Sequence, residues 1–157
     1  MMKIKELMTK KVITVTKDTK LSEVARLYAK YDIGFVVVIN SERDVLGVVT
    51  DRDIVIRGLA RGLSGDGVVE EVMTPVVVEI HRDENVRRAL EMMGENQIRR
   101  LVVVNDEKKL CGVVSLSDLA RGKYTNKYIN EILYEISIPN PQTEKPMKYL
   151  EVDDFPL

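Results

Sequence analysis

Two short segments of the chain carry a hydroxyl and, three residues later, a carboxylate. The first contains Thr50 and Asp53, and the second contains Ser115 and Asp118. A hydroxyl at a helix start caps the first turn, and a carboxylate three residues on completes a capping box beside the positive end of the helix dipole. The same groups can serve a ligand, because a carboxylate accepts hydrogen bonds from both hydroxyls of a ribose and a helix N-terminus holds phosphate. These residues alone leave both interpretations open.

Other residues that could do chemistry have simpler interpretations. His81 is the only histidine, and we predict a solvated loop residue rather than a metal ligand. Cys111, the only cysteine, precedes a glycine within an apolar run and is predicted to be a small buried hydrophobe. No glycine-rich phosphate loop or catalytic triad pattern occurs. We therefore expect a protein that is not an enzyme and binds no metal.

The elements that position these residues come from an internal duplication. Shifted by 65 residues, the chain aligns with itself without a gap from Glu6 to about Val55, and 14 of the 50 aligned pairs are identical. Gly47 aligns with Gly112 and Asp53 with Asp118. Chance would give roughly three or four identities, so the chain contains two copies of one unit.

Each copy predicts the same string of elements, β-α-β-β-α. The helices follow from apolar residues at a spacing of three to four, and the strands from short valine-rich runs around a polar turn. The predicted elements are an extended piece at 12–15 or 77–80, a helix from residue 21 or 86, strands at 35–39 and 45–49 or 101–104 and 110–114, and a second helix from about residue 51 or 116. Periodicity at 126–137 predicts one further helix, and the proline-containing tail 138–157 predicts an extended or disordered end.

The order of these motifs resembles the CBS domain family. The marks are an opening Met-Thr, an isoleucine before the apolar strand, and an ending Gly-x-x-Thr/Ser-x-x-Asp, and both copies carry all three. The resemblance covers residues 6–122. It implies an α/β (α+β) fold in which two β-α-β-β-α repeats pack with pseudo-two-fold symmetry. The predicted divisions are repeat 1 at 6–61, a linker at 62–70, repeat 2 at 71–125, and a C-terminal helix and tail at 126–157.

The resemblance also implies two ligand clefts between the repeats. One would contain Thr50, Arg52, Asp53, Val76, Val77, Arg99 and Arg100, and the other Ser115, Asp118, Lys11, Val12, Gly34 and Phe35. Arg99 and Arg100 align with Gly34 and Phe35, so only the first cleft would receive two guanidinium groups suited to phosphate. We therefore expect the Asp53 cleft to be the main nucleotide site.

Members of this family bind AMP, ADP, ATP or S-adenosylmethionine as regulatory ligands. By resemblance we expect an adenosyl ligand, a homodimer forming a four-repeat disc, and an effector protein that the sequence does not identify. A structural or dimerisation module without a ligand is the alternative.

Composition adds several exclusions. The 157 residues carry a formal net charge of −1, which argues against a role in nucleic-acid binding because such proteins need a basic excess. No apolar run is long enough to span a bilayer, and the N-terminus lacks the apolar stretch of a signal peptide. With one cysteine, the expected compartment is the cytoplasm.

Overall fold

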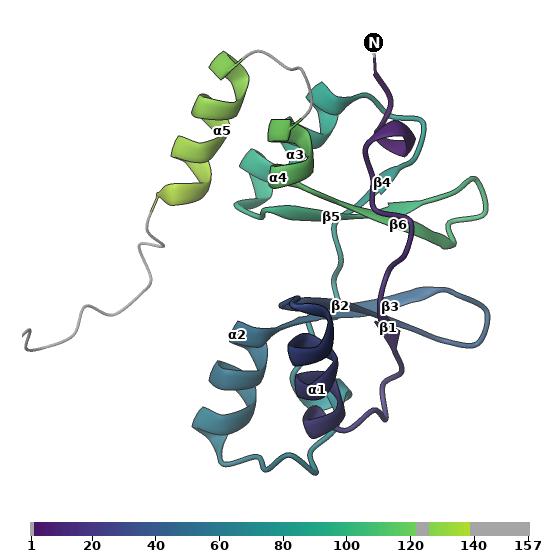
Figure 1. Ribbon diagram of the computed structural model, residues 1–157, viewed down its shortest axis with the longest axis vertical. Coiled ribbons are helices and arrows are strands. Elements are labelled where there is room, and N and C mark those ends of the chain that lie inside the picture. Colours follow the sequence, from purple (N-terminus) through teal and green to yellow (C-terminus); the bar gives the residue numbers. More distant parts are fainter. Residues whose placement is uncertain (1, 122–125, 139–157) are drawn as a thin grey trace, which may run out of the picture.

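The computed structural model describes residues 2–121 and 126–138, and most of the predicted tail lies outside these ranges. Two three-stranded sheets face each other at the centre, and helices cover their outer faces (Figure 1). The strands are β1 (Thr14–Val15), β2 (Phe35–Ile39) and β3 (Val45–Thr50) in one sheet, and β4 (Glu79–His81), β5 (Arg100–Val104) and β6 (Leu110–Ser115) in the other. In each sheet the first strand runs parallel to the second, and the third is antiparallel to it.

The helices follow the duplication as well. They are α1 (Leu21–Tyr31), α2 (Asp51–Asp53), α3 (Val86–Asn96), α4 (Leu116–Arg121) and α5 (Asn126–Ser137). After α2 the chain continues as a π-helical turn, η2 (Ile54–Gly58), and a 3-10 turn, η3 (Leu59–Arg61). Two further 3-10 turns, η1 (Ile4–Glu6) and η4 (Val69–Glu71), precede the two sheets. The predicted fold class, strands and C-terminal helix are confirmed.

Three cores hold these layers together. In β2, Val36 and Val38 pack against the repeat 1 helices, whereas Val37 points to the other sheet. All three are fully buried, because a strand with successive side chains on opposite faces can contribute to two cores at once. A continuous valine run therefore belongs in the centre of this fold.

The segment that precedes each sheet packs on the other repeat. Thr9 pairs with Val113 of β6 through two backbone hydrogen bonds, and Thr74 pairs with Val48 of β3 in the same way. The segment around Thr74 can approach β3 this closely because the residue before Val48 is a glycine. A Cβ placed on Gly47 would lie 2.9 Å from the Thr74 carbonyl oxygen. The crossing places residues around Thr9 beside the end of β6 and thereby builds an inter-repeat site.

The pseudo-two-fold axis is visible in contacts between equivalent residues. Asp44 and Lys109 align under the 65-residue shift, form an isolated bridge, and join their side chains through an ion pair of 2.5 Å. The turns containing them have left-handed backbone at Arg43 and Lys108, which also align. The two repeats therefore share the backbone conformation of these turns as well as the order of their elements.

Two predictions need correction. His81 is the last residue of β4 and not a loop residue, because Glu79–His81 pairs with β5. The spacing of Leu21, Val24, Leu27, Tyr28 and Tyr31 predicts that all five lie on the apolar face of the helix, but Tyr31 is 46% exposed, since it is the last residue of α1 and extends beyond the core. The second helix of repeat 1 is α-helical only to Asp53 and then widens into a π turn. Within the described residues, no helix is long and apolar enough to cross a membrane.

Candidate functional site

Both predicted capping boxes are present. The Thr50 hydroxyl accepts from the backbone N–H of Asp53 at 3.1 Å, and one carboxylate oxygen of Asp53 accepts from the N–H of Thr50 at 2.9 Å. Ser115 and Asp118 repeat these bonds at 3.1 and 2.9 Å. Each carboxylate uses Oδ2 for the cap, while Oδ1 of Asp118 accepts a long hydrogen bond from Arg121 at 3.5 Å and Oδ1 of Asp53 lies 3.9 Å from Arg57. Capping and ligand binding are therefore compatible in one residue.

A pocket of about 280 Å³ lies beside the second of these boxes. It contains all six residues that the sequence grouped in the second cleft, namely Ser115, Asp118, Lys11, Val12, Gly34 and Phe35. The two repeats both contribute to its wall, because Lys11 to Phe35 belong to repeat 1 and Ser115 and Asp118 to repeat 2. Its volume is near the lower end of the range of small-molecule sites.

Arg100 lines this pocket too, although the sequence grouped it with the Asp53 cleft. The register of β5 and β6 pairs Arg100 with Ser115, and its guanidinium lies 5.7 Å from the centre of the Phe35 ring. Arg100 and Phe35 align with each other under the duplication, so they meet close to the pseudo-two-fold axis. The two predicted arginines therefore differ in position: both are exposed, but only Arg100 lines this pocket.

The surroundings of Asp53 differ from those of Asp118. The guanidinium of Arg57 lies 3.9 Å from Asp53 Oδ1 and donates to the carbonyls of Val72 and Met73 and to the Thr74 hydroxyl. Asp53 therefore has a cation anchored beside its free oxygen. Asp118 has Arg121 at 3.5 Å, but that side chain is 77% exposed.

The remaining residues predicted for the first cleft have varied environments. Arg52 is exposed, Val76 is 82% exposed, and Val77 packs on the core between the sheets. The carbonyl of Arg99 accepts from the N–H of Leu116, just as that of Gly34 accepts from Asp51. The six residues predicted for the second cleft thus line one pocket of the described structure.

Sequence reasoning missed five residues of the pocket wall. They are Thr9, Ile13, Asp32, Ile33 and Val113. Ile13 follows the predicted residue Val12 in the sequence, and Ile33 precedes the predicted residue Gly34. Extending each predicted segment by one residue would have included both. Thr9 and Val113 meet only because the chain crosses to the other repeat, for which the sequence carries no local signal. Asp32 has a left-handed backbone, with φ of 51°, as the C-cap of α1.

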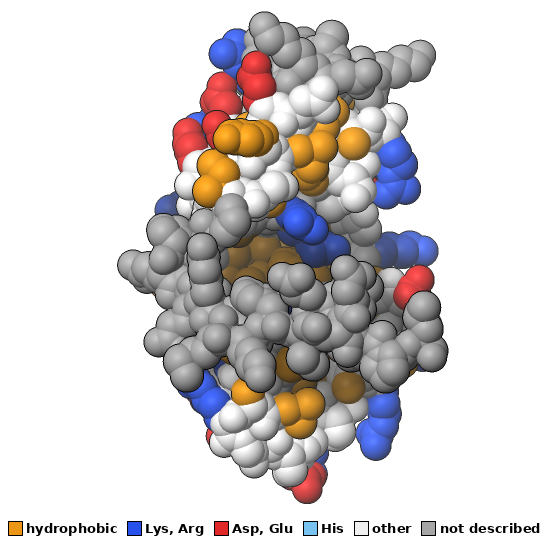
Figure 2. Space-filling model, turned by 90° about the vertical axis from the view of Figure 1, so that its left-hand side faces the viewer, with side chains coloured by type: hydrophobic (Ala, Val, Ile, Leu, Met, Phe, Trp, Pro, Cys, Tyr) orange, Lys and Arg blue, Asp and Glu red, His pale blue; other side chains and the backbone are white. Residues whose placement is uncertain are grey.

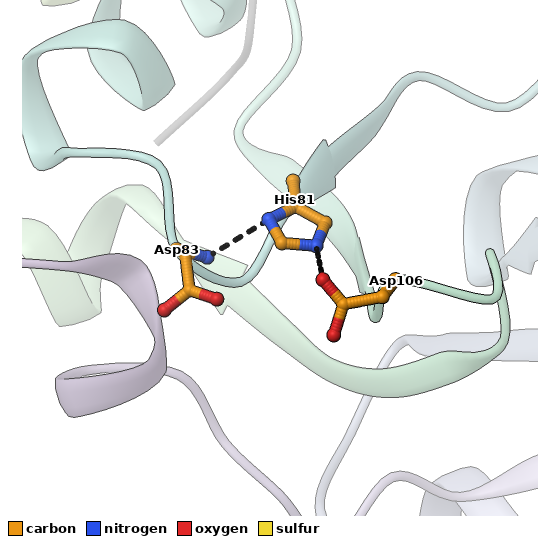
Figure 3. A group of neighbouring side chains, drawn as sticks. All are labelled: His81, Asp83 and Asp106. Atoms are coloured by element: carbon orange, nitrogen blue, oxygen red, sulfur yellow. Dashed lines mark hydrogen bonds and ion pairs between the residues drawn. The ribbon is translucent and has the colours of Figure 1, made fainter.

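One cluster outside the pocket has side chains suited to a metal. His81, Asp83 and Asp106 lie with ligand atoms within 4.8 Å of one another (Figure 3). Their atoms already have partners, however. The His81 ring lies 3.2 Å from Asp106 and accepts from the Asp83 N–H, while Lys5 lies 2.7 Å from Asp83 and Arg82 3.0 Å from Asp106. These cations oppose a second positive charge, so the cluster fits an ion-pair network better than a metal site.

Cys111 packs against the repeat 2 core in a half-buried position. Burial raises the pKa of its thiol above the ordinary value. Because the thiolate is the nucleophilic form, Cys111 is held in its unreactive form at neutral pH. This agrees with the small apolar residue predicted at that position.

The CBS domain family model matches residues 4–59 and 69–123. The chain therefore belongs to the CBS domain family, as a pair of repeats. The CBS domain-containing protein YhcV of Bacillus subtilis is 36% identical over 141 residues, covering 89% of this chain and 99% of that protein.

Two solved structures extend the comparison. The CBS domain pair of protein MJ0100, in complex with 5'-methylthioadenosine and S-adenosyl-L-methionine, is 27% identical with a TM-score of 0.70, covering 76% of this chain and 98% of that one. Hypoxic Response Protein I with two coordinated zinc ions is 29% identical with a TM-score of 0.71, covering 77% and 98%. CBS pairs of this fold thus include proteins with adenosyl ligands.

Proposed function

We propose that this chain is a non-catalytic regulatory module that binds an adenine nucleotide or related adenosyl ligand in the pocket beside Ser115 and Asp118. The observation that carries this proposal is the composition of the pocket wall. It places two carboxylates, Asp32 and Asp118, two cations, Lys11 and Arg100, and an apolar surface around one cavity formed by both repeats. A nucleotide has a group for each part of this wall: a phosphate for the cations, a ribose for a carboxylate, and an aromatic base for the apolar surface.

Each part of the ligand has a candidate partner. Asp118 Oδ1 accepts the ribose hydroxyls, because Oδ2 is occupied by the cap and the exposed Arg121 makes only a long hydrogen bond of 3.5 Å to Oδ1. Lys11, Arg100 and the Ser115 end of α4 attract phosphate oxygens, since charge-assisted hydrogen bonds to phosphate are strong. Val12, Ile13 and Ile33 give the base an apolar surface.

The adenosyl class draws support from the MJ0100 pair, whose complex contains 5'-methylthioadenosine and S-adenosyl-L-methionine. The position of Arg100 favours the Asp118 pocket as the principal phosphate site, in place of the Asp53 cleft favoured by the sequence. The Asp53 cleft, with Thr50, Arg52, Val76, Val77 and Arg99, remains a second proposed site of lower affinity for phosphate.

Binding between the repeats gives a route to regulation. A ligand that contacts both repeats stabilises one relative arrangement of the two sheets and so changes the outer surface offered to partners. We propose a cytoplasmic homodimer that acts on an effector protein. The chemistry of the pocket does not identify that effector.

A ligand-free dimerisation module is the alternative, because the capping boxes account for Thr50, Asp53, Ser115 and Asp118 as structural residues. A thermal shift experiment separates the two functions. AMP, ATP and S-adenosylmethionine are each added at millimolar concentration to the full chain. At 100 times the Kd a ligand adds about 2.7 kcal/mol to the free energy of unfolding, so a binder melts several degrees higher. No shift with any of the three, together with no co-purified ligand in native mass spectrometry, would establish the scaffold instead.

A further inference from the structure

Asp32 is the charged group of the pocket wall that none of the ligand contacts described above uses. It lines the pocket together with Asp118, Lys11 and Arg100. Its carboxylate forms no hydrogen bond or ion pair with the residues that the structure describes, whereas Asp118 is committed to the cap of α4. Asp32 therefore brings an unpaired negative charge to a pocket whose cations attract phosphate.

The backbone holds this residue at the mouth of a strand. Asp32 is the C-cap of α1, with φ of 51°, and its N–H donates to the carbonyl of Tyr28. Gln97, its counterpart under the 65-residue shift, is the C-cap of α3 with nearly the same φ of 53°. The left-handed backbone thus places the equivalent side chain just before β2 in one repeat and just before β5 in the other.

The cap itself does not need a carboxylate. Gln97 fills the same position with a neutral side chain, whose amide donates to the Glu135 carbonyl of α5 at 3.3 Å. Glycine and asparagine are the usual residues in a left-handed cap, and a negative charge is unfavourable at the C-terminal end of a helix dipole. The charge of Asp32 therefore works against the helix that it ends, which points to a use outside the helix.

The pocket lies at the end of the sheets where cations gather. Phe35 starts β2 opposite Thr50, and Arg100 starts β5 opposite Ser115. The helix α2 leaves from this end, on the left in Figure 1, and Figure 2 looks onto it. On that side the molecule is hollowed between the repeats, with hydrophobic side chains at the floor and Lys and Arg side chains at the edge (Figure 2). A carboxylate on the pocket wall limits how much negative charge such a surface attracts.

We propose that Asp32 determines which ligand charge the pocket accepts, so that it disfavours nucleoside polyphosphates and favours an adenosyl ligand with one phosphate or with a cationic group. This inference rests on the proposed function, since it concerns the same pocket. The two carboxylates and two cations of the wall cancel in formal charge. In a cavity of about 280 Å³ each of them acts on the ligand from within about one Debye length, roughly 8–10 Å.

The expected order of affinity follows from the charges of the ligands. ATP brings more negative charge than Lys11 and Arg100 balance, and Asp32 repels the excess. S-Adenosylmethionine offers its sulfonium and ammonium groups to Asp32 and its carboxylate to Lys11 or Arg100. AMP, with a single phosphate, matches the two cations. S-Adenosylmethionine and AMP should therefore bind more tightly than ADP, and ADP more tightly than ATP.

The test is calorimetric titration of the full chain and of Asp32→Asn with ATP, S-adenosylmethionine and adenosine in magnesium-free buffer. Removing the charge should lower the Kd for ATP about tenfold and raise the Kd for S-adenosylmethionine about threefold, because the lost charge acts with opposite sign on the two ligands. Adenosine is uncharged, and its Kd should stay the same. Both shifts should shrink at high salt.

Glu23→Gln is the matched control, because it removes one exposed carboxylate from the first turn of the same helix. Nine residues of helix separate Glu23 from Asp32, about 14 Å at 1.5 Å per residue, so this variant should leave all three Kd values unchanged. Asp32→Asn should melt at or above the wild-type temperature, since asparagine suits the left-handed cap and relieves the helix dipole.

The ligands also separate failure of this proposal from failure of the proposed function. Shifts in the same direction for all three ligands would overturn the proposal and show that Asp32 shapes the pocket instead of selecting charge. Unchanged affinity for both ATP and S-adenosylmethionine, with adenosine bound, would overturn it as well and leave the adenosyl site standing. A wild-type chain that binds none of the three would overturn the proposed function together with this inference.

Discussion

In repeat 2, Leu90, Met93 and Leu116 lie buried in a core that includes Ile129 and Ile132 of α5. Their counterparts in repeat 1 under the 65-residue shift are Ala25, Tyr28 and Asp51, which are exposed or half-buried. The backbones of the two repeats correspond, but the outer faces of their helices do not. A duplicated unit can therefore keep its internal motifs and still acquire a different neighbour on each copy.

The difference has a physical reason at two positions. Gly94 gives α5 room to approach α3, since a Cβ there would lie 2.8 Å from Ile132 Cδ1. Its counterpart Ala29 is exposed among the residues that the structure describes. Asp51 is charged where repeat 2 has Leu116, and an exposed charge disfavours an apolar cover.

The largest expected effect comes from breaking the contact between α5 and repeat 2. Ile132→Ala should lower the free energy of unfolding by about 2–4 kcal/mol, because Ile132 is 8% exposed and its removal leaves a cavity. Urea denaturation followed by circular dichroism measures this. Leu133→Ala, one residue on and 43% exposed, is the matched control and should change stability by less than about 0.5 kcal/mol. Equal effects would show that α5 does not pack on repeat 2.

A second prediction concerns Arg100 and Phe35, the aligned pair that meets near the axis. Arg100→Phe gives both repeats the same residue and removes one cation from the pocket. The Kd for AMP should rise roughly tenfold, because the lost interaction is a charge-assisted hydrogen bond. Adenosine, which lacks phosphate, should bind both proteins alike. Calorimetric titration of both ligands tests this, and an equal loss for adenosine would assign Arg100 a role other than phosphate contact.

The smallest expected effect concerns the ion pair on the axis. Hydrogen bonds from Lys109 and Asn40 hold the pKa of Asp44 below its ordinary value. A lowered pKa in the folded state means that the pair stabilises the fold above about pH 4, the unfolded value, and that this contribution is lost as pH falls through the folded pKa. Asp44→Asn should therefore lose less stability than wild type on acidification through this range. Melting curves of wild type, Asp44→Asn and the control Glu42→Gln would reveal it, and identical acid profiles would contradict it.

Much of the fold could be predicted from the sequence. The gapless repeat reveals two units, and the short valine-rich runs on either side of a polar turn place β2, β3, β5 and β6 within a residue of their ends. The helix α5 was predicted at its observed bounds. The π turn after Asp53 was not, since its i to i+5 bonding leaves no distinct pattern in a short apolar run.

The candidate site was predicted less completely. Local motifs give Ser115 and Asp118, and the resemblance to the CBS family gives Lys11 and Phe35. The position of Arg100 follows instead from the register of β5 with β6 and from the approach of the two sheets, which no local pattern reports. Thr9 joins the pocket only through the crossing of the N-terminal segment to repeat 2.

The proposed adenosyl site is tested most directly by calorimetric titration of AMP into a matched pair of variants, Asp118→Asn and Asp53→Asn. Each substitution keeps an oxygen for the cap and removes the charge that would accept ribose hydroxyls. We predict that Asp118→Asn weakens AMP binding about 10- to 100-fold, because hydrogen bonds to a charged acceptor are worth roughly 1.5–3 kcal/mol, and that Asp53→Asn stays within about twofold of wild type. Unchanged binding in Asp118→Asn, with a loss in Asp53→Asn, would contradict the account and place the principal site in the other cleft.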